Sequence, residues 1–315
     1  MPDPTSRPSG PIDVVLAADA RFSVPLAVVI ASLAEANRNQ SGGPDHYRVT
    51  IFAENFPAKV RDLVRAAGDE HLSVAWHIFD NADLKDLPTM HLSTAAYYRL
   101  LAPALLPDAE RIVYLDADVL VNTGLAPLAR TDLGDAVAGA VQNLNVPFLA
   151  SRNGLDSWDD LGLDPVAPYF NSGVLVMDRQ RWVDQRITER VLDLVRSGAE
   201  SARFVDQGPL NAVLAGDWRE LDHRWNQHPL VYARNSGLGT FLDRDIIDQV
   251  RADPWIIHFV GPVKPWHSAS THPWTDQWRT FARDLVGSAW RPDRRNRSTT
   301  PILRLKKATH AFIQG

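Results

Sequence analysis

The sequence contains no cysteine. Disulfide scaffolds, cysteine-ligated zinc sites and thiol nucleophiles are therefore excluded. Long apolar runs are also missing: the main uncharged apolar stretch of note, residues 22–34, has 13 residues and includes a proline, whereas a membrane-spanning helix needs about 20. The opening residues, MPDPTSRPSGP, have no apolar core, so we expect no secretory signal. These absences predict a protein of the reducing cytoplasm without a transmembrane segment.

Four motifs that mark common enzyme classes are absent as well. No G-x-G-x-x-G follows the first predicted strand, so a dinucleotide-binding fold is not supported. The sequence also has no G-x-x-x-x-G-K-[ST] phosphate loop, no H-E-x-x-H zinc motif and no G-x-S-x-G nucleophile elbow. A site on this chain must therefore be built from other residue patterns.

The composition is that of a folded protein with a large core. Hydrophobic residues make up 45% of the 315 positions and charged residues 23%, which excludes a disordered or fibrous chain. The net charge of −5 is unevenly spread, because residues 291–315 hold seven basic residues and one acidic residue. That segment carries +6, so the other 290 residues sum to −11. The acidic body argues against a nucleic-acid partner.

Short apolar segments alternate with helical patterns along most of the chain. Strands are predicted over 12–17, 47–53, 72–79, 111–115, 135–141, 173–177 and 255–260. Helices are predicted over 22–37, 57–67, 94–106, 179–197, 206–215 and 275–286. This alternation indicates an α/β fold with a mostly parallel, Rossmann-like sheet flanked by helices. We expect a leader at 1–11, one domain at 12–270, and a helix with a basic tail at 271–315.

Two carboxylates follow the predicted strand RIVYL, at Asp116 and Asp118. In an extended segment, residues two apart point the same way. Both side chains would then converge beyond the carboxyl end of a strand, where open α/β sheets bind ligands. Two close carboxylates raise each other's pKa unless a cation lies between them. The position favours a divalent metal ion bridging to a diphosphate, while turn or cap carboxylates are the ordinary alternative.

A second segment, HFVGPVKPWH at 258–267, begins in the last predicted strand and continues beyond its end. A neutral imidazole from His258, together with two carboxylates, suits ions such as Mn²⁺. Gly261 permits close approach of the backbone, and Lys264 supplies a compact charge for a phosphate. Taken alone, His258 also fits a buried structural histidine, and Lys264 a solvated surface lysine.

Six motifs together resemble glycosyltransferase family 8. They are LAAD at 16–19, YRL at 98–100, YLDADVL at 114–120, YFNSGVLVM at 169–177, DQ at 206–207 and HFVGPVKPWH, and they occur in the family's order. The resemblance covers residues 12–268 and is strongest to bacterial lipopolysaccharide α-galactosyltransferases and glucosyltransferases, and more distant to glycogenin. It implies a GT-A fold and a retaining transferase of a nucleotide-diphospho-sugar. It also implies Mn²⁺ as cofactor, with Mg²⁺ as the second candidate.

The resemblance assigns roles to individual positions. It implies that the metal ligands are Asp116, Asp118 and His258. It implies that the nucleotide base is bound by Ala17, Ala18 and Asp19 at the uracil edge and by Phe22 against the ring. The donor sugar would be bound by Arg99, Asn171, Ser172 and Asp206. The diphosphate and its metal ion would be bound by Asp116, Ala117, Gly261 and Lys264. Asp206 and Gln207 would act at the reacting centre, and Asn143 and Trp266 are candidate acceptor contacts.

Most of these positions also have an ordinary structural explanation. Asp19 could cap the following helix, Arg99 could pair with a surface acid, and Asn171 could sit in a turn. Four positions depart from the family pattern, one of them Ser172, where alanine is common and where the hydroxyl could add a hydrogen bond to the sugar. Arg21 stands where close relatives carry asparagine beside the base, Asn143 where one carries an acceptor-binding aspartate, and Gly208 where an acid is frequent.

The predicted function is transfer of glucose or galactose from UDP-glucose or UDP-galactose to a carbohydrate-containing acceptor. A phosphoryl or nucleotidyl transferase is an alternative, although it lacks a glycine-rich phosphate loop. A non-catalytic nucleotide-sugar-binding protein is a second alternative. The basic tail at 291–315 contains a loose apolar stripe at helical spacing. It predicts peripheral contact with the inner face of the cytoplasmic membrane, or else a solvated terminus.

Overall fold

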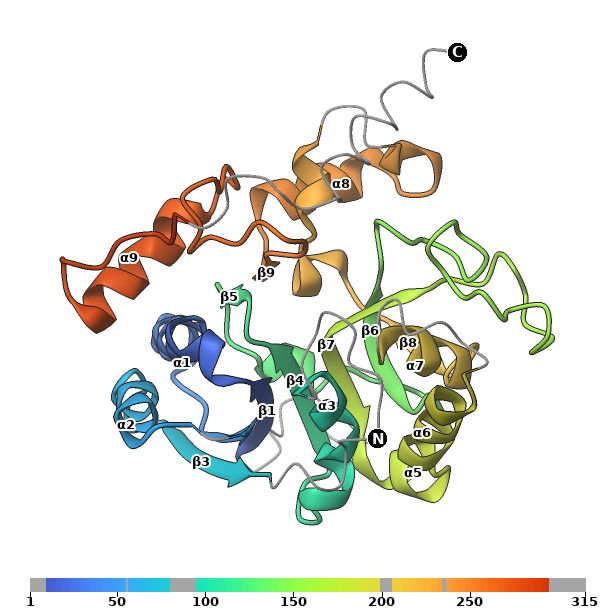
Figure 1. Cartoon of the computed structure of the whole chain (residues 1–315), viewed down its shortest axis with the longest axis horizontal. Helices are drawn as coiled ribbons and strands as arrows, with labels where there is room; N and C mark the ends of the chain where they lie inside the picture. Colours follow the sequence, from blue (N-terminus) through green and yellow to red (C-terminus); the bar gives the residue numbers. More distant parts are fainter. Residues whose placement is uncertain (1–9, 55, 80–94, 199–205, 234–236, 295–315) are drawn as a thin grey trace.

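A computed structural model describes residues 10–54, 56–79, 95–198, 206–233 and 237–294. A seven-stranded sheet has the order β3-β2-β1-β4-β7-β6-β8 (Figure 1). Its strands are β1 (Ile12–Ala18), β2 (Tyr47–Ala53), β3 (Leu72–Ile78), β4 (Arg111–Asp116), β6 (Ala138–Gln142), β7 (Phe170–Asp178) and β8 (Trp218–Glu220). β3, β2, β1 and β4 are parallel, β7 is antiparallel to β4 and β6, and β8 is parallel to β6. The expected α/β fold with a mostly parallel sheet is confirmed.

Helices cover both faces of this sheet (Figure 1). The longer helices are α1 (Ser23–Arg38), α2 (Ala58–Ala66), α3 (Ala95–Leu105), α6 (Ile187–Ser197), α8 (Arg244–Ala252) and α9 (Thr275–Val286). The shorter ones are α4 (Ala126–Ala129), α5 (Arg179–Asp184) and α7 (Gln207–Val213), with 3-10 turns η1 (Ala20–Phe22), η3 (His223–Asn226), η4 (Pro229–Tyr232) and η5 (Leu238–Thr240). The six helical regions predicted from the sequence correspond to α1, α2, α3, α5 with α6, α7 and α9. The helices α4 and α8 were not predicted.

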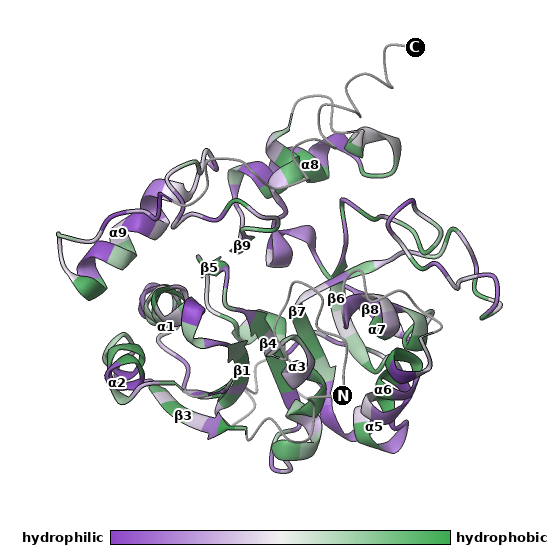
Figure 2. Ribbon diagram, in the orientation of Figure 1, coloured by the Kyte–Doolittle hydropathy of each residue, from purple (hydrophilic) through white to green (hydrophobic). Residues whose placement is uncertain are grey.

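The strand β1 shows why its sequence is apolar at nearly every position. Val14 and Leu16 pack in a core shared with α1 and α2. Val15 and Ala17 point to the opposite face and pack in a core shared with α3, α5, α6 and α7. Side chains alternate between the faces of a strand, so a strand covered on both sides must be apolar throughout. Figure 2 shows this concentration of hydrophobic residues in the central strands.

The helix α1 matches the predicted helix in length, and with the η1 turn before it forms a continuous helical run over Ala20–Arg38. Ala20–Arg38 is long and apolar enough, by length and composition, to cross a membrane, and no other helix in the described ranges is. Nevertheless, 61% of its most apolar window is buried inside the molecule, including Leu26, Val29 and Ile30. Pro25 lies in the first turn, where proline does not interrupt a helix. The segment therefore serves as a core helix in this structure.

The region 179–197 forms two helices, where the sequence predicted one. Arg186, between α5 and α6, has φ 53, in the left-handed region. Trp182 and Ile187 both pack in the core shared with α3 and α7. In one continuous helix, two residues five apart would point about 140° away from each other. The break turns both side chains toward the same core.

A small separate sheet pairs β5 (Val119–Val121) with β9 (Ile256–His258) in antiparallel register. Neither β5 nor β8 was predicted, because three-residue strands carry too little periodicity. Behind this sheet, α9 packs on α1, and Trp278 is fully buried in a core shared with Phe259 and Val28. The division of the chain at residue 270 stays a prediction. The tail at 291–315 lies outside the described residues from 295 onward.

Candidate active site

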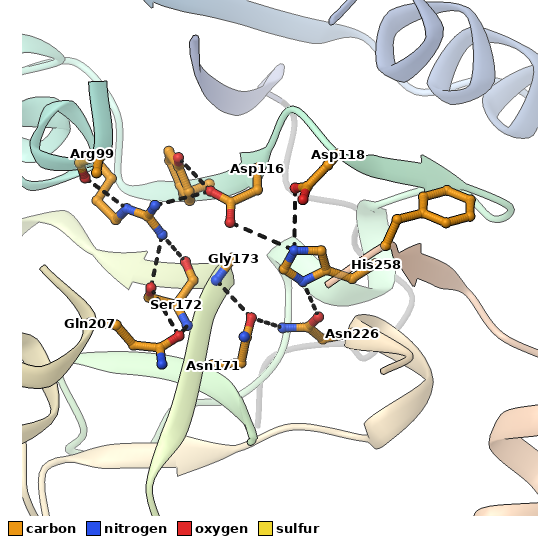
Figure 3. Close-up of polar contacts among 12 residues, drawn as sticks. Arg99, Asp116, Asp118, Asn171, Ser172, Gly173, Gln207, Asn226 and His258 are labelled. Carbon is orange, nitrogen blue, oxygen red and sulfur yellow. Dashed lines mark hydrogen bonds and ion pairs between the residues drawn. The ribbon is translucent and has the colours of Figure 1, made fainter. Parts of the chain in front are cut away.

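The candidate metal ligands meet because β5 pairs with β9. Asp116 is the last residue of β4, Asp118 precedes β5, and His258 is the last residue of β9. The register places Val119 opposite His258, and the Phe259 N–H donates to the Asp118 carbonyl at 3.0 Å. The two carboxylates predicted to converge at a strand end therefore face the imidazole (Figure 3).

One ligand atom from each of these three side chains lies within 4.8 Å of the others. His258 Nε2 is 3.7 Å from Asp116 Oδ2 and 3.3 Å from Asp118 Oδ1. His258 and Asp118 are buried, and the Asp116 side chain is 26% exposed, which leaves an open side. Two carboxylate oxygens and one imidazole nitrogen suit Mn²⁺ or a similar divalent ion. The residue types and their spacing therefore fit a metal centre.

Lys264 pairs with the carboxylate of Asp118. Its Nζ forms an ion pair with Asp118 Oδ2 and donates to the Phe259 carbonyl at 2.7 Å. Burial by itself raises the pKa of Asp118, but the charge of Lys264 and the hydrogen bond that it donates outweigh burial and hold that pKa well below its usual range. Asp118 is therefore a carboxylate, the form in which it binds a cation.

Arg99 pairs with the other carboxylate of the cluster, that of Asp116. Its guanidinium is buried, lies 3.0 Å from Asp116 Oδ1 and 2.9 Å from Asp206 Oδ2, and also donates to Ser172. The Tyr114 hydroxyl donates to the same Asp116 oxygen at 2.8 Å. Burial raises the pKa of Asp206 to about 6, with Asp116 adding to the rise and Arg99 opposing it. Arg99 thus links the metal ligands to the start of α7.

A bulge in β7 opens the sheet beside the metal ligands. The β6–β7 register shifts between Ala140 and Val141, which pair with Leu175 and Asn171. Side chains satisfy the backbone groups left between them: the Ser172 N–H donates to Gln207 Oε1 and the Gly173 N–H to Asn171 Oδ1, each at 3.0 Å. Bulges that bend a strand next to a site are frequent in enzymes.

Gln207 therefore has a structural contact at each end of its amide. In addition to the bond from Ser172, its Nε2 donates to the Tyr169 hydroxyl at 3.3 Å. Asp206, just before α7, is 2% exposed and pairs with Arg99. The structure brings both residues, predicted for the reacting centre, to the wall formed by the β7 bulge.

The residues predicted for the nucleotide lie at the end of β1. Ala17 pairs in register with Asp116, so this edge adjoins the metal ligands. Asp19 accepts hydrogen bonds from Arg21, including one from its backbone N–H at 2.8 Å and one from its NH2 at 2.7 Å. Phe22 lies edge-on to Trp266, with ring centroids 5.7 Å apart. Ala18 and Ala117 are also buried.

The remaining predicted positions have clear local roles. Gly261 has φ +102, a conformation that favours glycine, in the loop that leads to Lys264. Asn143 is buried, and its Oδ1 accepts from the backbone N–H groups of Asn145 and Val146 at 2.9 and 3.3 Å. Trp266 packs between Phe22 and Trp278. Acceptor binding by Asn143 and Trp266 stays a prediction.

Sequence reasoning missed two residues that shape the metal centre. Asn226 in η3 contacts His258 Nδ1 through Oδ1 at 2.8 Å. A Cβ at Gly173 would lie 2.2 Å from His258 Cε1, so only glycine fits there without a shift. Gly173 belongs to the motif YFNSGVLVM and was within reach of that pattern. Asn226 carries no comparable sequence signal.

Comparison with known proteins agrees with this geometry. The profile of Glycosyl transferase family 8 matches residues 13–270. General stress protein A of Bacillus subtilis (strain 168) is 30% identical over 213 residues, which are 66% of this chain and 70% of that protein. Lipopolysaccharide 1,2-glucosyltransferase of Escherichia coli (strain K12) is 27% identical over 306 residues, which are 96% of this chain and 86% of that protein.

A solved structure shows the same architecture. The crystal structure of an active-site mutant of LgtC, in which a glutamine is replaced by glutamate, aligns with a TM-score of 0.71 and 25% identity. The alignment covers 87% of this chain and 96% of that one. With the GT-A fold, an Asp-Asp-His cluster at the edge of its sheet and a family match over most of its length, this chain belongs to glycosyl transferase family 8 and is a glycosyltransferase.

Proposed function

We propose that the protein is a retaining, Mn²⁺-dependent hexosyltransferase. It moves glucose or galactose from a UDP-sugar to a hydroxyl group of a glycan, glycolipid or small-molecule acceptor. The observation that carries the proposal is the meeting of Asp116, Asp118 and His258 beside the end of β1. A relative that covers most of the chain is named a lipopolysaccharide 1,2-glucosyltransferase, which supports a hexose donor.

Asp116, Asp118 and His258 would hold the metal ion, with Mn²⁺ as the first candidate and Mg²⁺ as the second. A bound divalent ion acts as a Lewis acid toward the leaving diphosphate. Lys264 supplies a fixed positive charge next to Asp118. In our proposal its Nζ binds the diphosphate, where negative charge grows as the bond to the sugar breaks.

Gln207 and Asp206 would stabilise the sugar at the reacting centre. An amide oxygen is a weak nucleophile, so we propose front-side attack in place of a covalent sugar–enzyme intermediate. The bond between the anomeric carbon and the diphosphate oxygen breaks, and the acceptor oxygen bonds to that carbon on the same face. The proton of the acceptor hydroxyl passes to the departing phosphate. Arg99 would orient Asp206, with which it pairs at 2.9 Å.

The nucleotide would lie across the end of β1, with Ala17, Ala18 and Asp19 at the uracil edge and Phe22 against the base. Ala117 and Gly261 would approach the diphosphate through their backbones. Because Arg21 engages the Asp19 carboxylate, its guanidinium lies next to any base held by that residue. Asn171 and Ser172 would line the sugar pocket beside Gln207.

For the acceptor, we propose a membrane-associated glycan or glycolipid. The protein would work in the cytoplasm, at the inner face of the membrane, through the basic segment 291–315. A basic apolar segment near anionic lipid gains about 1 kcal/mol per Lys or Arg. A soluble small-molecule acceptor is the alternative.

The test is donor turnover in the absence of an acceptor. UDP-glucose and UDP-galactose are incubated with the full chain and Mn²⁺, and released UDP is measured for the unmodified protein, Asp118→Asn and Asp253→Asn. Asp253 is an exposed acid that pairs with Arg224 and serves as the matched control. We expect Mn²⁺-dependent UDP release that Asp118→Asn abolishes and Asp253→Asn retains. Release of hexose 1-phosphate in place of UDP would identify a nucleotidyl transferase, and binding without turnover a non-catalytic binding protein.

A further inference from the structure

A chain of hydrogen bonds runs from the β7 bulge to the imidazole of His258 (Figure 3). The Gly173 N–H donates to Asn171 Oδ1 at 3.0 Å, and Asn226 Nδ2 donates to the same oxygen at 2.9 Å. Asn226 Oδ1 lies 2.8 Å from His258 Nδ1. Asn171, Asn226 and His258 are 8%, 5% and 4% exposed. All the side chains in this series of hydrogen bonds are therefore shielded from water.

The backbone N–H of Gly173 determines which atom donates and which accepts in each of these hydrogen bonds. A backbone N–H can only donate, so the Asn171 atom that faces Gly173 must be the carbonyl oxygen. That oxygen can only accept, so Asn226 must turn its NH2 group toward it. The Asn226 oxygen is then left facing the imidazole, and it accepts a proton that His258 must carry on Nδ1.

The Nε2 atom of neutral His258 is consequently an acceptor with a free lone pair. This atom faces the Asp118 and Asp116 carboxylates, at 3.3 and 3.7 Å. Three electron-rich atoms directed at one point repel each other unless a cation lies between them. With Nε2 protonated, His258 would instead donate to Asp118 and close the site. The amide chain favours the form of His258 that binds a metal ion.

The backbone holds Asn226 in this position. The Gln227 N–H donates to the Ile256 carbonyl at 2.9 Å, and the His258 N–H donates to the Gln227 carbonyl at 3.0 Å. These bonds tie η3 to β9 on either side of the Asn226–His258 contact. Both ends of that contact are thus fixed by main chain, as expected for a residue that orients a ligand.

We propose that Asn226 is a positioning residue of the metal centre: through Asn171 and Gly173 it fixes the proton of His258 on Nδ1 and directs Nε2 toward the cation. The inference rests on the proposed function, because it assumes the metal centre. It adds a residue from η3 to the site. It also connects the β7 bulge, which carries Ser172 and Asn171, to the metal ligands by a continuous set of bonds.

The experiment measures the protonated nitrogen of His258 and the Mn²⁺ affinity in separate assays. Two-bond ¹H–¹⁵N correlation of the metal-free, ¹⁵N-labelled protein reports the nitrogen, and His258→Gln assigns the signal. Electron paramagnetic resonance of free Mn²⁺ gives the affinity without donor or turnover. The variants are Asn226→Leu and Asn226→Asp. The control is Asn37→Leu, which removes an equally buried amide bonded to the backbone of Asp45 in another part of the fold.

We expect the proton on Nδ1 in the unmodified protein and in Asn226→Asp, which retains an acceptor for it. In Asn226→Leu we expect it on Nε2, with Mn²⁺ bound about 10- to 100-fold more weakly. Asn37→Leu should bind Mn²⁺ as the unmodified protein does. A proton on Nε2 in the unmodified protein, or Asn226→Leu affinity within twofold of the control, overturns the inference. An unmodified protein that binds no Mn²⁺ overturns the proposed metal centre itself.

Discussion

The backbone of Gly173 faces the imidazole of His258 so closely that an added Cβ would lie 2.2 Å from Cε1 and 2.7 Å from Asp116 Oδ2. Carbon atoms in contact normally stay about 3.5–4.0 Å apart. The glycine therefore provides the space in which an imidazole and a carboxylate from two distant strands meet. This requirement comes from close approach and not from an unusual backbone conformation.

Gly173→Ala should accordingly displace His258 and disrupt the metal centre. We expect Mn²⁺ affinity and donor turnover to fall at least about 100-fold, because misplacement of a reacting group by about 1 Å costs that much. Far-UV circular dichroism should remain unchanged. Gly239→Ala is the control, since a Cβ there meets nothing within 4 Å. Normal Mn²⁺ binding by Gly173→Ala would contradict the packing described here.

Removal of the Arg99 guanidinium should destabilise the fold. Arg99→Met leaves the carboxylates of Asp116 and Asp206 without their shared cation, and loss of one partner from a buried pair costs about 3–5 kcal/mol. We expect a decrease of that size in the free energy of unfolding in urea. Arg65→Met, which breaks an exposed pair with Asp62, should cost less than about 1 kcal/mol. Equal losses in both variants would show that Arg99 is not a buried anchor.

Two substitutions of Gln207 distinguish its contact with the Ser172 N–H from its contact with the Tyr169 hydroxyl. Gln207→Glu retains an acceptor for the Ser172 N–H but loses the donor to the Tyr169 hydroxyl, whereas Gln207→Ala loses both. If Gln207 stabilises the reacting centre, both variants should lower kcat with little change in donor affinity. Gln207→Ala should also lose about 1–3 kcal/mol of stability, because a backbone donor in the bulge is left unpaired. Wild-type turnover in Gln207→Ala would exclude a role near the anomeric carbon.

Stability should fall as the pH drops below 6.5, partly through the buried His228 and the half-buried His272. Burial lowers the pKa of His228 to about 3 and that of His272 to about 4, whereas the ordinary value is 6.5. Between these values the unfolded chain binds the additional protons, so acid favours unfolding. For His228, the loss between pH 7 and pH 5 is about 2 kcal/mol.

His228→Asn isolates this effect. His228 Nδ1 accepts from the Leu230 N–H at the start of η4, and an asparagine oxygen can accept the same bond without titrating. Urea unfolding at pH 7 and pH 5 should show a pH-dependent loss that is smaller by about 2 kcal/mol in the variant. The same loss in both proteins would mean that His228 is not buried in its neutral form.

The basic tail yields a prediction about membranes. If residues 291–315 contact anionic lipid, the full chain should sediment with phosphatidylglycerol vesicles at low salt and be released at high salt. The chain without these residues should remain in the supernatant and retain donor hydrolysis. Equal, negligible sedimentation of both proteins would exclude the membrane contact and favour a soluble acceptor.

The sequence was sufficient for six of the seven strands of the main sheet and for the two carboxylates of the candidate metal cluster. Ile12–Ala18 and Arg111–Asp116 are apolar on both faces, a local pattern that identifies buried parallel strands. Asp116 and Asp118 were identifiable because they stand at the end of such a strand and just beyond it. Their convergence with His258 depended on the resemblance to a family, since no local pattern connects β5 to β9.

Contacts between distant segments were beyond the reach of local patterns. The break at Arg186 is decided by the core that Trp182 and Ile187 share, and a helical periodicity continues across it. Asn226 looks like any loop asparagine in the sequence, and its importance lies in a bond to His258. Asn143 matched a family position, but only the structure shows that its oxygen binds the backbone of its own loop.

The β5–β9 pairing also sets the time at which a newly made chain acquires its chemistry. Strands β1 to β4 all lie within the first 116 residues and can pair while translation continues. Asp116 and Asp118 emerge with them, but the imidazole that completes their cluster is at position 258 and docks only with β9. A nascent chain that stops before that strand therefore has a sheet but an incomplete cation site. The candidate metal cluster is therefore completed only late in synthesis.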